Sequence, residues 1–99
     1  MIFRNQFRFS NISSKKSKGW FDQIRVGEIE CKNRFMVASL TRNRGDYVTG
    51  VGNDTVTEYY KQRAGFGLIF TEASQISQRG HGYPGACGLI TAEQTEFWK

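Results

Sequence analysis

Hydrophobic and polar residues alternate along residues 24–31, on both sides of Gly27. An alternation with a period of two indicates β-strands, and a glycine between them marks a turn. This stretch therefore predicts a short β-hairpin that turns near Gly27 and Glu28. Two later stretches, 34–39 and 67–71, are almost continuously apolar. Such runs are typical of strands covered on both faces, as in a parallel sheet.

The segment between the two apolar runs divides into a loop and a helix. Residues 41–52 are rich in Gly, Arg, Asn and Asp without periodicity, which predicts a loop. A helix is expected to begin near Asn53, Asp54 or Thr55, any of which can cap it, and Thr55 and Glu58 match a capping box. Gly65 is expected to end this helix in a left-handed conformation. Its inward face is predicted to hold Val56, Tyr60, Arg63 and Ala64.

Strand, loop, helix and strand in this order make a βαβ unit, which predicts an α/β protein. Residues 72–99 are dominated by turn-forming residues and predict a long loop of the kind that carries function on a rigid scaffold. Thr91 is expected to cap a last helix, with Phe97 and Trp98 on its buried side. Because a lone βαβ unit leaves strand edges unpaired, we expect the chain to be part of a larger α/β protein.

Length and charge exclude several classes of protein. The chain has 99 residues, whereas a complete (β/α)8 barrel takes about 250. Residues 1–19 carry five of the 14 basic residues and none of the nine acidic ones, so residues 20–99 are neutral. The body therefore lacks the basic excess that nucleic-acid binding requires, and no nucleic-acid partner is expected. No apolar stretch is long enough to span a bilayer, so no membrane insertion is expected.

The segment 1–19 is predicted to be a basic, disordered leader, separate from a domain over residues 20–99. Its Arg-, Lys- and Ser-rich, acid-free composition is also typical of a mitochondrial transit peptide, and this alternative stays open. We expect the protein to be cytoplasmic, or mitochondrial if the leader acts as a transit peptide.

The cysteines and the histidine indicate no metal site. Cys31 and Cys87 lie far apart in the sequence and form no CxxC pair. The only histidine, His81, stands in a glycine-rich stretch without a cysteine nearby. Free thiols in a reducing compartment are therefore expected.

Several motifs over about residues 20–99 resemble, in order, those of the Old Yellow Enzyme family of FMN-dependent ene-reductases. The resemblance implies the N-terminal fragment of a (β/α)8 TIM barrel: a bottom hairpin, strand–helix–strand, a long loop and the start of a further helix. FMN is then expected at the C-terminal mouth of the strands. The motifs are NRFMVASLTR (33–42), EYYKQRA (58–64), GLIFTEA (67–73), QIS (75–77), GYPGA (82–86), EQ (93–94) and WK (98–99).

The same resemblance implies roles for five residues. The backbone of Ser39, Leu40 and Thr41 is expected to contact the isoalloxazine ring of FMN, and the Thr41 hydroxyl to lie near its C4 carbonyl and N5. Ala73 matches a position where a small residue lets the backbone approach the pyrimidine side of the flavin. Tyr83 matches a tyrosine that lines the substrate side of the pocket. Without the motifs, each would be interpreted as a strand-end or surface residue.

Other matched positions are expected to be structural. Arg42 is predicted to hold its loop by a salt bridge, Arg63 and Glu58 to stabilise the helix, and the tyrosines 59 and 60 to pack. Ser39 departs from the family, which usually has proline there; serine frees φ and restores an N–H. The family's catalytic and phosphate-binding residues match no position in residues 1–99, so weak or no FMN binding is expected.

Two functions remain open at this point. The first is part of an enzyme in which NADPH or NADH reduces FMN, and the flavin then passes hydride to an alkene conjugated to a carbonyl group. Its partner is a small enone-type substrate, and no residue of this chain is expected to be catalytic. The alternative is a non-catalytic, truncated fragment that neither binds FMN nor turns over by itself, and that self-associates through its open strand edges.

Overall fold

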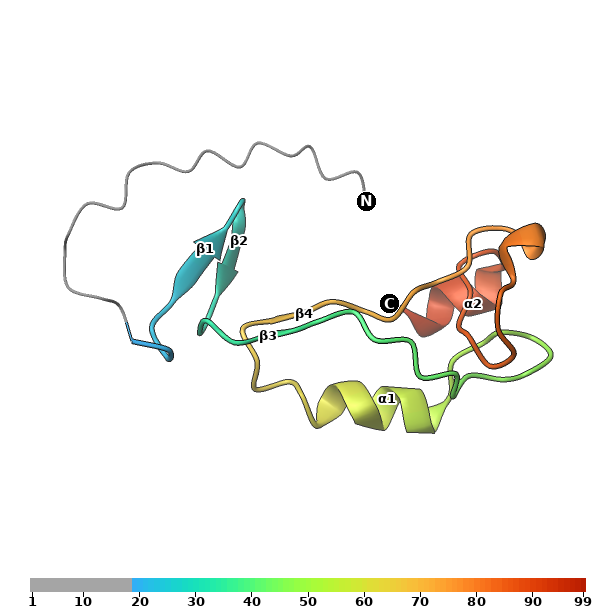
Figure 1. Ribbon diagram of the computed structural model, residues 1–99, viewed down its shortest axis with the longest axis horizontal. Coiled ribbons are helices and arrows are strands. Elements are labelled where there is room, and N and C mark those ends of the chain that lie inside the picture. Colours follow the sequence, from blue (N-terminus) through green and yellow to red (C-terminus); the bar gives the residue numbers. More distant parts are fainter. Residues whose placement is uncertain (1–18) are drawn as a thin grey trace.

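The computed structural model of the protein describes residues 19–99, which are coloured along the chain in Figure 1. The predicted leader 1–19 lies outside the described residues except for Gly19, so its role and the domain boundary stay predictions. The described part is elongated (Figure 1). Much of its apolar surface is uncovered, since Phe21 is 80% exposed and Leu40 60%.

The predicted hairpin is present. Strands β1 (Ile24–Val26) and β2 (Ile29–Cys31) pair antiparallel, with Ile24 opposite Cys31. Gly27 makes the turn with a φ of +61°, a conformation that glycine adopts without strain. Cys31 is buried and is one of the few core residues of the described chain.

The predicted βαβ unit is also present. Strands β3 (Met36–Val37) and β4 (Leu68–Ile69) pair in parallel, and helix α1 (Asp54–Lys61) connects them and lies along one side of the pair (Figure 1). The register joins residues 32 apart in sequence, since Met36 lies opposite Leu68. The regular strands are shorter than the apolar runs that predicted them.

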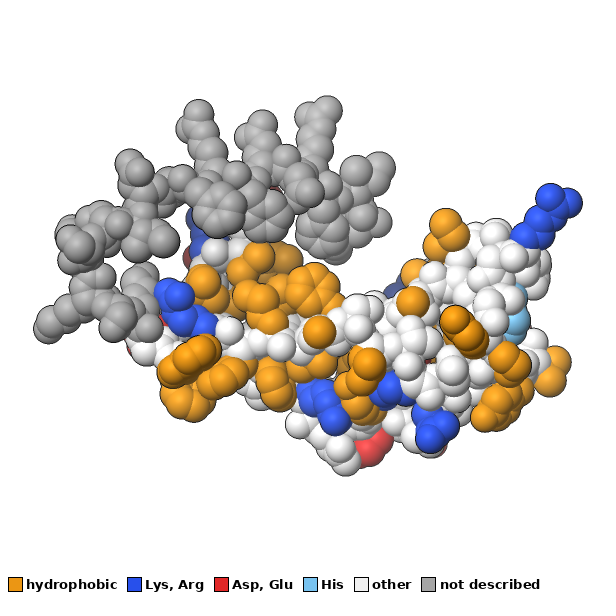
Figure 2. Space-filling view, in the orientation of Figure 1, with side chains coloured by type: hydrophobic (Ala, Val, Ile, Leu, Met, Phe, Trp, Pro, Cys, Tyr) orange, Lys and Arg blue, Asp and Glu red, His pale blue; other side chains and the backbone are white. Residues whose placement is uncertain are grey.

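The prediction that both strands are covered on both faces is wrong for the described residues. Met36 is 41% exposed and Phe70, just after β4, is 49% exposed. The reason is that β3 and β4 have only each other as sheet partners in the described part of the chain. Figure 2 shows hydrophobic side chains gathered at the surface over the hairpin and the adjoining strand pair.

Helix α1 starts where the sequence predicts, but without the predicted capping box. Asn53 is the N-cap, because its Oδ1 accepts the Val56 N–H at 3.2 Å. The capping box of Thr55 and Glu58 is therefore wrong, and both residues lie inside the helix. Asn53 outcompetes them because its Nδ2 also donates to the Arg44 carbonyl at 2.7 Å. Val56 is fully buried, which confirms the predicted inward face at this position.

The predicted left-handed stop at Gly65 is also wrong. Helix α1 ends at Lys61, and Gln62 keeps a right-handed conformation while its N–H bonds to Glu58 O. A further turn follows, in which the Ala64 N–H donates to Lys61 O at 3.1 Å. The chain thus leaves the helix through right-handed turns and does not need the glycine's left-handed conformation.

The long loop after β4 is folded against the earlier loop. Gly45 N–H donates to Gly85 O at 2.8 Å, and Gly88 N–H donates to Gly50 O at 2.9 Å. A short 3₁₀ helix, η1 (Gln78–Gly80), which the sequence did not predict, lies within it.

Helix α2 (Ala92–Phe97) begins at the predicted N-cap, Thr91, which forms a capping box with Gln94. The buried residue of this helix is Gln94, whose Nε2 donates to Thr49 O at 2.7 Å, while Phe97 and Trp98 are half-buried. The helix is therefore attached to the loop before α1 by a polar contact as well as by its aromatic residues.

Both cysteines are free, as expected, and both are buried. No group of three or more His, Cys, Asp and Glu side chains that could hold a metal ion occurs among residues 19–99. A helix long and apolar enough to cross a membrane is likewise absent from this described stretch.

Candidate functional site

The carboxyl ends of β3 and β4 are tied together by side chains. Ser39 Oγ donates to Thr71 O at 2.6 Å, and the Ala73 N–H donates to Thr41 Oγ1 at 3.3 Å. Each bond joins residues 32 apart, so both keep the register of the strand pair beyond its last regular residues. Thr41 and Ala73, predicted separately, therefore meet at one point.

A cavity of about 180 Å³ opens beside this meeting point. Thr41, Ala73 and Tyr83 all line it, so the structure brings together three of the five predicted site residues. Ser39 and Leu40 precede Thr41 in the chain and are exposed, but they do not line the cavity. The assignment of these five residues to flavin and substrate stays a prediction.

Sequence analysis missed Gln75, which also lines the cavity. Its side chain is 9% exposed, and its Nε2 is buried without a hydrogen-bond partner among the described residues. The sequence feature that could have identified Gln75 is its position shortly after an apolar strand, where polar residues of an α/β protein often face a ligand.

A buried ion pair supports the strand ends. Arg42 Nη2 donates to Glu72 Oε2 at 2.8 Å, and the Arg42 main-chain N–H reaches the same oxygen at 3.3 Å. The side chains are 13% and 0% exposed. The predicted salt bridge of Arg42 is thus confirmed, and its partner Glu72 is the residue that sequence analysis did not name. Arg42 follows Thr41 and Glu72 precedes Ala73 in the chain. The ion pair therefore fixes the backbone at Thr41 and Ala73.

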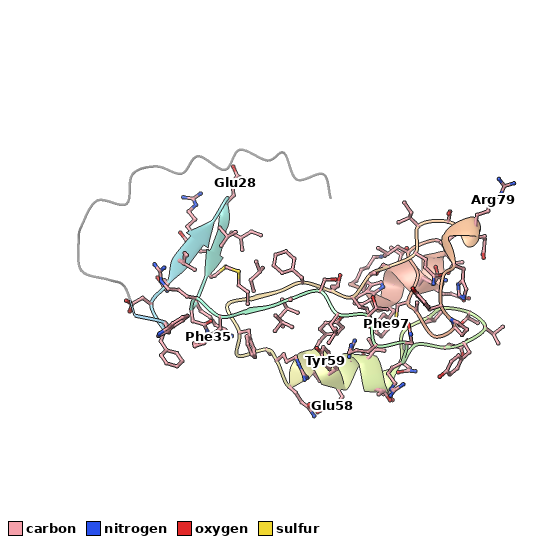
Figure 3. All side chains as sticks on the ribbon, in the orientation of Figure 1. Glu28, Phe35, Glu58, Tyr59, Arg79 and Phe97 are labelled. Atoms are coloured by element: carbon pink, nitrogen blue, oxygen red, sulfur yellow. The ribbon has the colours of Figure 1, made fainter. Side chains whose placement is uncertain are left out.

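Two guanidinium groups enclose Tyr59 of α1. Arg42 Cζ lies 3.4 Å and Arg63 Cζ 3.5 Å from the centre of the Tyr59 ring. Two carbons this close to one ring centre lie on opposite faces, because on one face they would collide. Figure 3 shows Tyr59 between α1 and the strand pair, with Glu58 pointing away. Such cation–π contacts attach the helix to the strand ends.

The other tyrosine of the pair also serves packing, as predicted. Tyr60 Oη accepts the Glu72 N–H at 2.9 Å. Burial raises the pKa of Tyr60 above its ordinary value of 10.0. The phenol therefore stays neutral and acts as a fixed acceptor for the strand end.

Cys87 is fully buried, and its thiol lies close to the Glu72 carboxylate of the ion pair. Burial, then the hydrogen bond and the negative charge of the Glu72 carboxylate, raise the pKa of the Cys87 thiol from 9.0 to about 12. This thiol is therefore a packing group, because the reactive form of cysteine is the thiolate.

The raised pKa of Cys87 predicts a loss of stability in alkali. The thiol of the unfolded chain ionises first, so the free energy of unfolding is expected to fall as the pH rises from about 9 towards 12. Chemical unfolding at several pH values checks this. The Cys87→Ala variant is expected to show a shallower fall; Tyr60, present in both, adds the same slope to each. Identical slopes would contradict the assignment.

The chain is similar to known proteins in both sequence and structure. Residues 20–99 match the sequence model of the NADH:flavin oxidoreductase / NADH oxidase family. The chain belongs to this family. The Old Yellow Enzyme resemblance is thereby confirmed, since an Old Yellow Enzyme homologue is among the similar solved structures.

Two curated relatives show the extent of the match. Flavin oxidoreductase hxnT of Emericella nidulans is 39% identical over 83 residues, and enoate reductase 1 of Kluyveromyces lactis is 35% identical over 82 residues. Each match covers 80% of this chain and 21% of the relative. The chain therefore spans about a fifth of the length of these relatives.

Solved structures confirm the fold. The Old Yellow Enzyme homologue from Zymomonas mobilis superposes with a TM-score of 0.75 at 44% identity, over 82% of this chain and 22% of that one. Morphinone reductase superposes with a TM-score of 0.78 at 35% identity, over 87% and 22%. The predicted partial (β/α)8 barrel is thus confirmed, and residues 19–99 form no closed barrel.

Proposed function

We propose that residues 20–99 supply part of the flavin-binding surface of an NAD(P)H-dependent oxidoreductase that reduces alkenes conjugated to a carbonyl group. The observation that carries this proposal is the contact between Thr41 and Ala73 in one cavity at the carboxyl ends of two parallel strands. In barrels of this class, that end of the strands carries the chemistry. Family membership supplies the cofactor class.

The residues present fit the ring of FMN. None of the hydrogen bonds among the described residues uses the amide N–H of Ser39, Leu40 or Thr41. These main-chain donors are therefore not used in strand pairing, and the donor of Thr41, which lines the cavity, remains for an acceptor-rich ligand such as the isoalloxazine ring. Because Thr41 Oγ1 accepts the Ala73 N–H, its own hydroxyl hydrogen is available to a ligand.

Bound FMN would supply hydride transfer between NAD(P)H and the alkene. The residues of this chain would hold the ring through these donors, and the Arg42–Glu72 ion pair would keep the ends of β3 and β4 at a fixed distance from each other. Tyr83 forms the wall of the cavity on the loop side. No lysine or arginine lines the cavity among the described residues, so the phosphate of FMN gains no cation there.

This arrangement predicts that the full chain binds FMN and riboflavin weakly and with similar affinity. Thr41→Val is expected to weaken binding of both about three- to tenfold, because one hydrogen bond contributes roughly 0.5–1.5 kcal/mol. Ala73→Phe is expected to abolish binding by filling the approach to the ring. Quenching of flavin fluorescence in a titration measures both effects.

The matched control for Thr41→Val is Thr95→Val, since the Thr95 hydroxyl also makes one exposed hydrogen bond, to Thr91 O at 2.9 Å on α2. It is expected to leave flavin binding unchanged. A marked preference for FMN over riboflavin would contradict the proposal, because it would require a phosphate site. Equal effects of the two threonine substitutions would contradict the role of Thr41.

A chimera tests the whole-enzyme function. The segment of the Zymomonas mobilis homologue that matches residues 20–99 is replaced by those residues, where the two are 44% identical. The chimera is expected to retain FMN and to reduce an enone with NADH or NADPH. Ala73→Phe in the same chimera is expected to remove the bound flavin. A folded chimera without FMN would overturn the proposal.

For the chain by itself we propose a non-catalytic state with self-association. The observations that support it are the open edges of the β3–β4 pair and the exposed apolar side chains beside them, since Leu40 is 60% exposed and Phe70 49%. Sedimentation velocity over a dilution series is expected to show a concentration-dependent mass. A monomer at all concentrations, or turnover of an enone by the chain with added FMN, would contradict this state.

A further inference from the structure

The main-chain ladder between β3 and β4 stops at a defined bond. The Phe70 N–H donates to Val37 O at 3.0 Å, which is the last main-chain hydrogen bond of the pair. A regular parallel ladder would continue at Ser39, with its N–H donating to Phe70 O and its carbonyl accepting the Glu72 N–H. Neither bond is present, and the Glu72 N–H donates to Tyr60 Oη instead.

Side-chain hydroxyls take over where the ladder stops. Ser39 Oγ donates to Thr71 O at 2.6 Å, within the usual range for a hydroxyl donor. Two residues later, Thr41 Oγ1 accepts the Ala73 N–H. The spacing of 32 residues set by the main-chain ladder is kept at both bonds. The strands therefore stay in register while the amides of residues 39–41 take no part in their pairing.

We propose that Ser39 is a positioning residue of the flavin-binding surface. Its hydroxyl holds the end of β3 on β4 in place of its main-chain groups, and this leaves the N–H groups of residues 39–41 without a partner on β4 and available to a ligand. An alanine at this position would lose the one hydrogen bond among the described residues that joins residue 39 to the end of β4. The inference rests on the proposed function for its ligand, but the bond itself is present without one.

Two measurements on the full chain test Ser39→Ala. Amide hydrogen exchange at Ala73 is expected to be about threefold faster without flavin, because the hydroxyl tether two residues away is lost. Riboflavin is expected to bind about threefold more weakly in a fluorescence titration. Exchange at Cys31, which is buried in β2 of the hairpin at the other end of the strand pair (Figure 1), is expected to be unchanged.

Two further variants make the result specific. Ser39→Thr keeps a hydroxyl and is expected to restore both the exchange rate of Ala73 and riboflavin binding. Thr95→Ala removes a hydroxyl of similar exposure on α2 and is expected to change neither. If Ser39→Ala also speeds exchange at Cys31, the substitution has loosened the whole fold, and Ser39→Thr is then compared with the original chain. A threonine variant that behaves like alanine overturns the proposal.

The remaining outcomes separate this inference from the proposed function. Unchanged Ala73 exchange in Ser39→Ala overturns the positioning role. Absence of riboflavin binding to the original chain overturns the claim that its residues hold the ring, while the exchange measurement still decides whether Ser39 fixes the strand ends. Faster exchange at Ala73 with unchanged riboflavin binding overturns the link between the tether and the ligand.

Discussion

Glu72→Gln is expected to unfold the chain at least partly at 25 °C. Removing one partner of a buried ion pair leaves the other charge uncompensated, which destabilises proteins by about 3–5 kcal/mol. Here the remaining charge would be Arg42, only 13% exposed. Because a small domain has roughly 5 kcal/mol of stability or less, the loss is comparable with the total. Urea unfolding followed by circular dichroism measures it.

The chain offers a matched control in Glu96→Gln. Glu96 and Lys99 also form an ion pair of 2.8 Å, but their side chains are 72% and 68% exposed. Exposed pairs contribute about 0–1 kcal/mol, so this variant is expected to change the free energy of unfolding only slightly. Similar losses for Glu72→Gln and Glu96→Gln would show that burial of the Arg42–Glu72 pair has no energetic effect.

Replacing both partners tests what the ion pair contributes as a pair. Arg42 Nε and Glu72 Oε1 are buried and make no hydrogen bond with the described residues. An ion pair with unsatisfied atoms gains little over an apolar pair of similar volume. Arg42→Met with Glu72→Leu is therefore expected to be much more stable than Glu72→Gln alone. The double variant is nevertheless expected to lose flavin binding, because the strand ends lose their support.

The second large effect is expected for Gly67→Ala. A Cβ at this position would lie 2.1 Å from the carbonyl oxygen of Asn33, which belongs to the backbone. The glycine has little room to move away, because its N–H donates to Phe35 O at 2.9 Å at the start of the strand pair. We expect a loss of about 1–3 kcal/mol or more in the free energy of unfolding, the range for overpacked sites.

Gly65→Ala, two residues earlier, is the control for this substitution. Nothing lies within 4 Å of its added Cβ, and its φ is not in the left-handed region. At such a position alanine is expected to stabilise by up to about 1 kcal/mol, because it restricts the unfolded chain. Thermal unfolding of the two variants is expected to shift the midpoint in opposite directions. A stable Gly67→Ala would mean that Asn33 and β4 do not approach each other closely.

The hairpin and the start of α2 were predictable because their signals are local. The turn at Gly27 and the capping box of Thr91 and Gln94 each involve residues at most three positions apart. The sequence placed the start of α1 correctly but left three possible caps; Asn53 has a second contact, with Arg44, which no local pattern contains. The end of α1 was predicted wrongly because right-handed turns continue after Lys61.

The site was predictable only through the resemblance to a family. The motifs placed Thr41, Ala73 and Tyr83 at one mouth, and the structure places all three at one cavity. Gln75 was indicated as a lining residue only by its position after an apolar strand, and nothing in the sequence pattern indicated Glu72 as the partner of Arg42. Both assignments depend on which segments lie close together in space. Arg42 and Glu72 are 30 residues apart in the sequence, and the cavity at Gln75 is lined by residues of separate segments.

The order of the elements, the parallel pairing of two apolar strands and the family could all be predicted from the residue types and their local patterns. The tertiary structure decided which polar groups meet at the strand ends: the hydroxyl of Ser39 with Thr71, and the charge of Arg42 with Glu72. These contacts depend on the register between β3 and β4 and on the packing of α1 beside them. Periodicity sets which face of an element is apolar, but it does not set the distance between two elements.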